Sequence, residues 1–273
     1  MMHRGVLLIA SLGFAGALAA QTSSPPAPPP DRVPAHDSFT VVSRALGESR
    51  PINVYTPPGY ATSPAARFPV LYMPDGAIDE DFPHVVNTVD SLIALHLIRP
   101  IVVVGIPNTQ RRRDLTGPTR VHSDSTIAPR VGGSAAFRQF IRNELMPAVR
   151  ARYRVTDERS IVGESLAGLF VIETFLLEPT LFDHYVAFDP SLWWNAGALV
   201  DSAAPRIRAL DAKPRTLFFA GSTDMDAKPQ RLAGLLRDAA PKSLTWSYEP
   251  RPDLTHATIF RAAAPQALAR ALR

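Results

Sequence analysis

The chain has 273 residues, a formal net charge of +4 and no cysteine, and 46% of its residues are hydrophobic. This balance excludes a largely disordered or fibrous chain, and the small excess of positive charge gives no reason to expect a nucleic-acid partner. Without cysteine the chain has no disulfide, no thiolate nucleophile and no cysteine for lipid attachment. The length suits one large domain with ample material for a core.

The first 20 residues are typical of a secretory signal peptide. A basic start at His3 and Arg4 precedes an apolar run, and Ala17-Leu18-Ala19 matches the small-residue cleavage pattern. The run is shorter than the roughly 20 residues of a spanning helix, which favours cleavage over a membrane anchor. We therefore expect a periplasmic or secreted protein with no stable membrane insertion after signal removal. The proline-rich residues 21–35 are expected to form an extended linker ahead of a domain at 36–273.

That domain begins with two expected antiparallel strands around a turn at Leu46-Gly47-Glu48. Buried strands and helical segments then alternate, and Pro147 inside one helical segment predicts a kink or break there. In chain order the expected elements are strands Ser38–Arg44, Pro51–Tyr55 and Pro69–Met73, helix His84–Ile98, strand Ile101–Ile106, helix Ala135–Tyr153, strand Ser160–Gly163, helix Leu166–Leu177, strands His184–Phe188 and Thr216–Ala220, helix Pro229–Asp238, strand Leu244–Tyr248 and helix Thr258–Leu272. This alternation predicts an α/β fold, a mostly parallel sheet with helices on both faces and a site at the carboxyl ends of its strands.

The segment Gly163–Gly168 (GESLAG) is the strongest chemical signal in the chain. Ser165 lies where a strand ends and a helix begins, with small residues at the −2 and +2 positions, as a nucleophile elbow requires. Ala167 replaces the usual glycine at +2. A serine that only caps the helix is the alternative to a nucleophile.

Chain order places the acid and the base after the serine. His256 is the expected base because it lies in a loop after the last strand, whereas His184 follows the elbow helix too soon. Asp224, just after strand Thr216–Ala220, is the expected acid. Asp226 is the alternate acid and Asp253 a weaker third candidate, and a serine–histidine pair without an acid stays open.

Backbone amides should hold the oxyanion. The first expected donor is the amide of Leu166, and the second is that of Gly76 or Ala77 in the loop after strand Pro69–Met73. Trp193 and Trp194 are candidate substrate-binding residues that would form an aromatic wall.

Arg113, in the run Arg111–Arg113, is a further candidate substrate contact for an anionic group. A solvated basic loop is the alternative interpretation of this run. No metal-ligand spacing and no phosphate-binding glycine loop occurs in the sequence, so we expect neither a metal nor another cofactor.

Several spaced blocks together resemble the putative esterase family of α/β-hydrolases, in particular its branch of periplasmic siderophore esterases and esterase D-like proteins. The blocks are Ile52–Tyr60, Val70–Gly76, Val104–Asn108 with Arg113–Thr116, Gly163–Gly168, Pro190–Trp194 and His256. The resemblance implies an α/β-hydrolase fold, Ser165 as nucleophile and His256 as base. It does not define the ester, because the wider family acts on aryl, acyl, feruloyl and trilactone esters.

The hypothesis from the sequence is an exported serine esterase that acts on a small-molecule ester through an acyl-enzyme, with siderophore trilactones and aryl or acyl esters as candidate substrates. The alternatives are a catalytically silent binding protein with the same fold and a peptidase. A peptidase is disfavoured because the sequence has no propeller or cap domain to select peptides.

Overall fold

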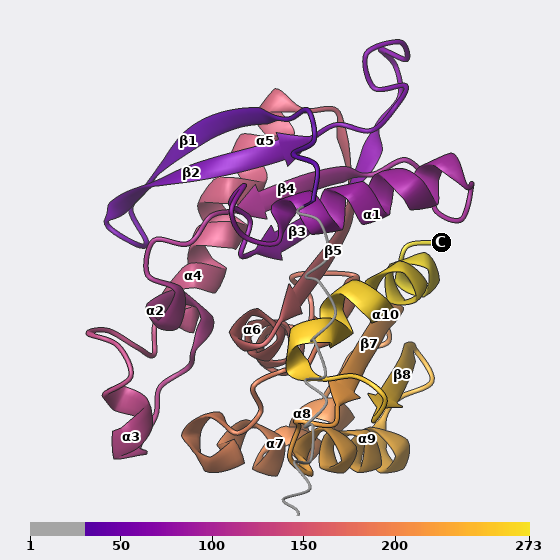
Figure 1. Cartoon of the computed structure of the whole chain (residues 1–273). Helices are drawn as coiled ribbons and strands as arrows, with labels where there is room; N and C mark the ends of the chain where they lie inside the picture. The colour runs from indigo at the N-terminus through magenta and orange to yellow at the C-terminus, as the bar shows by residue number, and fades with distance from the viewer. Residues whose placement is uncertain (1–30) are drawn as a thin grey trace, which may run out of the picture. The chain divides into compact units, whose positions relative to one another are not determined.

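Eight strands form one sheet in the computed structural model, which describes residues 31–273 (Figure 1). They are β1 (Asp37–Ser43), β2 (Glu48–Tyr55), β3 (Phe68–Pro74), β4 (Val102–Ile106), β5 (Val155–Glu164), β6 (His184–Phe188), β7 (Arg215–Ser222) and β8 (Leu244–Arg251). Their spatial order is β1-β2-β4-β3-β5-β6-β7-β8. The expected signal peptide lies outside the described residues.

Only β2 runs against the other seven strands. β1 pairs with β2 and β2 with β4 in antiparallel fashion, and every later pair is parallel. The prediction of a mostly parallel sheet with an antiparallel start is therefore confirmed. β3 is buried along its whole length, as its continuous apolar sequence predicts for a strand covered on both faces.

Helices connect the parallel strands and follow them on both faces of the sheet. Their bounds are α1 (Phe82–Ala94), α2 (Arg111–Leu115), α3 (His122–Ser125), α4 (Ser134–Phe140), the π-helical η1 (Ile141–Leu145), α5 (Met146–Arg152), α6 (Leu166–Leu177), the 3₁₀ turn η2 (Trp194–Gly197), α7 (Ala198–Asp201), α8 (Ala203–Arg208), α9 (Lys228–Ala239) and α10 (His256–Ala271). The short elements α2, α3, η2, α7 and α8 were not among the expected ones.

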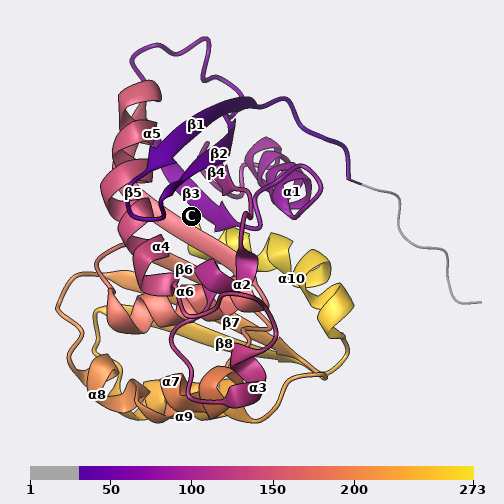
Figure 2. The ribbon, with the colours of Figure 1, turned by 90° about the vertical axis from the view of Figure 1, so that its left-hand side faces the viewer.

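The alternation of side chains along the strands divides the core into two layers. Leu71 and Val103 point to the layer under α1 and α10, and Tyr72 and Val104 to the layer under α4, α5 and α6. Figure 2 shows these two groups of helices on opposite sides of the sheet. α6 is buried from Leu166 to Leu176 and has apolar residues on all sides, which suits a helix enclosed by the core.

Pro147 does not break its helix. Helical structure is continuous from α4 through η1 to α5, and Pro147 stands in the first turn of α5, so the predicted break is absent. The π-helical turn shifts the hydrogen bonds, so that the Met146 amide donates to the Ile141 carbonyl. One turn of wider helix accommodates the missing proline N–H, as π-bulges do elsewhere.

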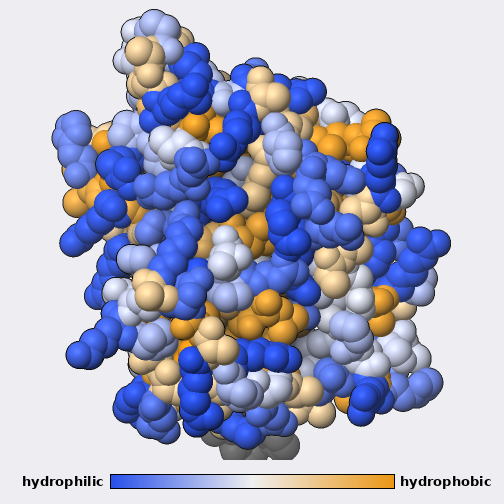
Figure 3. Space-filling view, turned by 180° about the vertical axis from the view of Figure 1, so that it is seen from behind, coloured by the Kyte–Doolittle hydropathy of each residue, from blue (hydrophilic) through white to orange (hydrophobic). Residues whose placement is uncertain are grey.

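The compact unit begins at Asp31, ahead of the predicted domain start at His36. Asp31 forms an ion pair of 2.6 Å with Arg261 of α10, and the Arg32 carbonyl accepts a hydrogen bond of 2.9 Å from Asn87 of α1. Within the described part of the chain no helix is long and apolar enough to cross a membrane. Figure 3 shows a largely hydrophilic face with small, separate hydrophobic patches.

Candidate active site

Ser165 occupies a strained turn between β5 and α6. Its φ of 59° and ψ of −118° lie in a region that non-glycine residues rarely adopt. The amide of Ser165 donates to the Phe188 carbonyl at 3.0 Å, and its carbonyl accepts from the Ser191 amide at 3.0 Å. Bonds to the end of β6 therefore maintain the turn, which carries the hydroxyl at the carboxyl edge of the sheet.

The small residues around Ser165 are required by close backbone contacts. A Cβ on Gly163 would lie 2.7 Å from Ala167, and a Cβ on Gly168 would lie 2.8 Å from the Phe188 carbonyl oxygen. Ala167 itself is fully buried. The structure thus explains the departure from the usual motif. The alanine side chain of Ala167 fits at the +2 position, whereas Gly168 at +3 lies too close to β6 for any side chain.

His256 is the first residue of α10, and its ring meets a carboxylate from a different strand end than expected. Nδ1 of His256 lies 3.0 Å from Oδ2 of Asp189, the residue directly after β6. Asp189 is fully buried and also accepts bonds of 2.6 Å from the amide and the hydroxyl of Ser222. These bonds fix a carboxylate against the imidazole, as an orienting acid requires.

The prediction that Asp224 orients the imidazole is wrong. Its Oδ2 accepts a 2.7 Å hydrogen bond from the backbone amide of His256, so it supports the start of α10 and not the ring. The alternates are also engaged elsewhere: Asp226 pairs with Lys228 at 2.6 Å and Asp253 with Arg251 at 2.7 Å.

Sequence reasoning missed Asp189 because it looked for the acid only after β7. β6 lies between β5 and β7, so its carboxyl end is nearer to Ser165 than that of β7. The available signal was an aspartate directly after the buried strand Tyr185–Phe188.

Ser165, Asp189 and His256 line one cavity of about 430 Å³, together with Ser191, Trp193, Asp224, Met225 and Asp226. Within residues 31–273 the Ser165 hydroxyl contacts the Ser191 hydroxyl at 3.5 Å and forms no hydrogen bond to the imidazole. In unliganded sites such contacts are commonly long and shorten when a substrate binds. The structure thus brings the predicted nucleophile and base to one cavity.

The expected oxyanion donors differ in their availability. Leu166 opens α6, so its amide has no acceptor within the helix. The Gly76 amide donates to the Ile106 carbonyl at 3.2 Å and the Ala77 amide to the Glu80 carboxylate at 2.8 Å. Gly76 is therefore engaged in the backbone of the sheet edge, which does not fit the predicted role. Ala77 contacts a side chain that an oxyanion can displace.

Of the predicted substrate contacts, Trp193 alone faces the cavity. Its side chain is 44% exposed, whereas Trp194 is buried and its indole N–H donates to the Gly117 carbonyl at 2.8 Å. Arg113 is held by Glu48 at 2.8 Å and Asp114 at 2.6 Å. Trp194 and Arg113 therefore hold the surrounding loops in place and do not line this cavity.

Charge around the site favours a protonatable imidazole and a charged acid. The hydrogen bond that the His256 ring donates to the Asp189 carboxylate raises the pKa of His256 above its ordinary value. Burial alone would raise the pKa of Asp189, but hydrogen bonds from His256 and Ser222 lower it below its ordinary value. Burial, with the nearby charge of Asp81, raises the pKa of Glu164 to about 7.

We expect Glu164→Gln to change how stability depends on pH. A folded-state pKa of about 7, above the ordinary 4.5, means that the folded protein binds more protons between these values. The stabilisation by protonated Glu164 is therefore lost as pH rises from about 4.5 to about 7. The melting temperature of the variant should exceed that of wild type by a margin that grows over this range and is then constant.

Thermal unfolding at a series of pH values measures that margin. The exposed Asp238 at the end of α9 provides a control, because Asp238→Asn removes a solvated carboxylate. A margin that is the same at pH 5 and pH 8 would contradict the expectation for Glu164.

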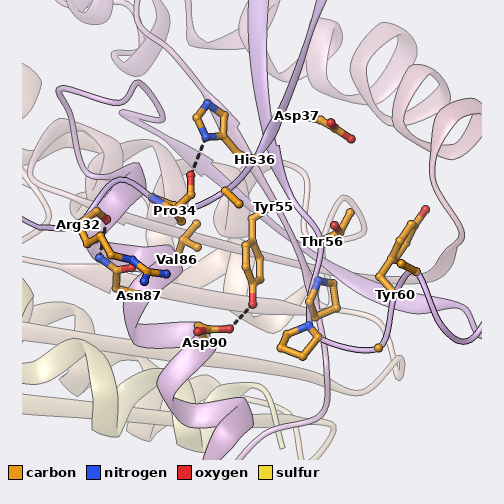
Figure 4. Close-up of a pocket in the computed structure, with 15 residues that line it drawn as sticks. Arg32, Pro34, His36, Asp37, Tyr55, Thr56, Tyr60, Val86, Asn87 and Asp90 are labelled. Atoms are coloured by element: carbon orange, nitrogen blue, oxygen red, sulfur yellow. Dashed lines mark hydrogen bonds between the residues drawn. The ribbon is translucent and has the colours of Figure 1, made fainter.

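A second cavity, of about 520 Å³, lies far from these residues (Figure 4). It contains Tyr55, whose hydroxyl donates to Asp90 of α1 at 2.5 Å. Tyr55 pairs with Val103 near the start of β4, so this cavity lies at the edge where the parallel strands begin. None of the predicted site residues lines it. Among the described residues no group of three or more potential ligands could hold a metal ion.

Residues 43–243 match the model of a family described as Putative esterase. The ferri-bacillibactin esterase BesA of Bacillus subtilis (strain 168) is 30% identical over 168 residues, which are 54% of this chain and 56% of that protein. A siderophore triacetylfusarinine C esterase of Aspergillus fumigatus is 34% identical over 152 residues, which are 50% of this chain and 49% of that protein. The matches thus span about half the length of these curated relatives.

The fold has a solved counterpart in an IroE-like serine hydrolase from Shewanella oneidensis. The two structures superpose with a TM-score of 0.79 at 27% identity, over 86% of this chain and 79% of that one. The predicted α/β-hydrolase fold and the predicted family resemblance are both confirmed.

Proposed function

The chain belongs to the putative esterase family, and from this premise we propose that it is an exported serine hydrolase that cleaves carboxylic esters through an acyl-enzyme. One observation carries the proposal: the strained Ser165 faces the same cavity as an imidazole that is bonded to a buried carboxylate. Acyl transfer needs an exposed nucleophile, an oriented base and a donor to the oxyanion. The strained turn at Ser165, the imidazole bonded to Asp189 and the first amide of α6 supply them in this proposal.

In this mechanism the Ser165 hydroxyl attacks the ester carbonyl while Nε2 of His256 takes its proton. Asp189 holds Nδ1 as the protonated nitrogen and stabilises the imidazolium that forms. The amide of Leu166 donates to the oxyanion, and the amide of Ala77 joins it by leaving the Glu80 carboxylate. The imidazolium protonates the departing alcohol. Water that has lost a proton to His256 then releases the acid and regenerates the serine.

We propose siderophore esters as the substrates. Simple aryl and acyl esters are the other candidate substrates. The names of the two curated relatives support this class, and an aromatic wall at Trp193 suits an aryl group. The expected signal peptide supports action in the periplasm or outside the cell.

A fluorophosphonate probe tests the proposal directly. It should label the protein stoichiometrically at Ser165, because the probe reacts only with a serine activated by a base. Peptide mapping of the adduct by mass spectrometry gives the labelled residue. A protein that stays unlabelled would be a catalytically silent binding protein, and a label on another residue would refute Ser165 as the nucleophile; either result would overturn the proposal.

A further inference from the structure

Four arginines line a cavity of about 580 Å³ that contains no residue of the catalytic cavity. Its walls are Thr109, Gln110, Arg111, Arg112 and Arg113 on one side and Ala128, Pro129 and Arg130 on the other. No acidic side chain belongs to this lining. The volume lies within the about 300–1,000 Å³ that is typical of small-molecule sites.

The four guanidinium groups are not equally neutralised. Arg111 pairs with Asp75 at 2.7 Å, and Arg113 pairs with Glu48 and Asp114. Arg112 and Arg130 are exposed, and neither has an ion pair within residues 31–273.

The charge of these two arginines is therefore available to a ligand. Arg112 is positioned by a hydrogen bond of 3.0 Å to the Ile127 carbonyl, next to the wall that carries Arg130. That bond leaves the remaining N–H groups of its planar fork to face an anion, and guanidinium groups bind carboxylates through two parallel bonds.

The cavity adjoins the catalytic edge of the sheet. α2 follows β4, and the carboxyl end of β4 pairs with that of β3, where Pro74 meets Ile106. The segment between the two walls contacts the loop that carries Trp193: the Gly117 carbonyl accepts from Trp194, and the Arg120 amide donates to Asn195. Figure 2 shows α2 and α3 along this edge.

We propose that Arg112 and Arg130 form an anionic subsite, which selects esters that carry a carboxylate on the arm remote from the scissile bond. The inference rests on the proposed esterase function and adds a substrate class to it. The arm would pass from Ser165 along Trp193 to the arginine cavity. Its carboxylate would exchange water for two charge-assisted interactions, which discriminate against an uncharged arm of the same shape.

Matched substrates test this preference. A series of mono-4-nitrophenyl esters of dicarboxylic acids, from glutarate to suberate, is compared with the same esters methylated at the free end. At the length that reaches the cavity, wild type should show a KM about tenfold lower for the charged ester, and the Arg112→Ala/Arg130→Ala variant should lose this preference. The KM of the methylated ester should stay the same in both proteins.

The exposed pair Arg208 and Arg237, on α8 and α9, provides the control for net charge. Arg208→Ala/Arg237→Ala removes two positive charges elsewhere and should keep the preference for the charged ester. Equal KM values for the two ester types at every length in wild type, or a preference that persists without Arg112 and Arg130, would overturn the subsite.

A binding measurement separates failure of the subsite from failure of the esterase function. Calorimetry on the Ser165→Ala variant, with the charged and the methylated esters, needs no turnover. Tighter binding of the charged ester that disappears on removal of Arg112 and Arg130 supports the subsite even if no ester is hydrolysed. Equal binding of the two esters would overturn it, even if wild type hydrolyses both.

Discussion

Ser165→Ala should lower kcat for a simple aryl ester by about 10⁵- to 10⁶-fold, the loss seen when an activated serine is removed from a triad. The alanine removes only the attacking oxygen. The turn is maintained by the backbone of Ser165, through Phe188 and Ser191, so the fold should be retained. Initial rates with 4-nitrophenyl acetate and a melting curve measure the two effects.

Ser191→Ala is the matched control, because its hydroxyl lies 3.5 Å from that of Ser165 and faces the same cavity. Ser191 has neither the strained backbone nor the position before a helix that Ser165 has. The Ser191→Ala variant should therefore keep its activity within about tenfold of wild type. Turnover by Ser165→Ala above a tenth of the wild-type rate would disprove the assigned nucleophile.

Asp189→Asn should lower kcat by about 10³- to 10⁴-fold, while Asp224→Asn should lower it less than tenfold. The asparagine can offer its N–H₂ to Nδ1 of His256 and so favour the tautomer that has no free electron pair to direct at Ser165. Asp224 contacts the backbone of His256 and has no such influence on the ring.

The substitution at Asp189 is compatible with the fold. Its φ of 40° is a left-handed value that asparagine also adopts readily, and the side-chain oxygen can still accept from the Ser222 amide. Steady-state kinetics on the two variants measure which aspartate contributes more to kcat. A larger loss for Asp224→Asn than for Asp189→Asn would restore the acid that was expected from the sequence.

The pH profile gives Asp189 a readout that a merely structural role would not change. The base must be neutral, so kcat/KM falls as pH drops through the pKa of His256, which Asp189 raises. Removing that carboxylate charge lowers the pKa, so the acid limb of the Asp189→Asn profile should move to lower pH. Glu164 also raises the pKa of His256, and its neutralisation should move the limb in the same direction by less.

The sheet and its helices followed from local patterns along the chain. The short continuous apolar run Val70–Met73 predicts a strand covered on both faces, and the predicted bounds of α6 agree with the structure. The predicted break at Pro147 was wrong because a π-helical turn, which depends on the packing of the whole helix, accommodated the proline.

At the proposed site the sequence by itself predicted the pair Ser165 and His256, which the structure brings to one cavity, because an elbow motif and a histidine after the last strand are local signals. Only the tertiary structure decided which carboxylate meets the imidazole. Asp189 is 67 residues from His256 and Asp224 is 32, but β6 lies next to the nucleophile strand and its end is buried. The order of the strands in the sheet and the direction of each side chain decide which carboxylate reaches the imidazole. Neither can be inferred from the residues of one strand or loop alone.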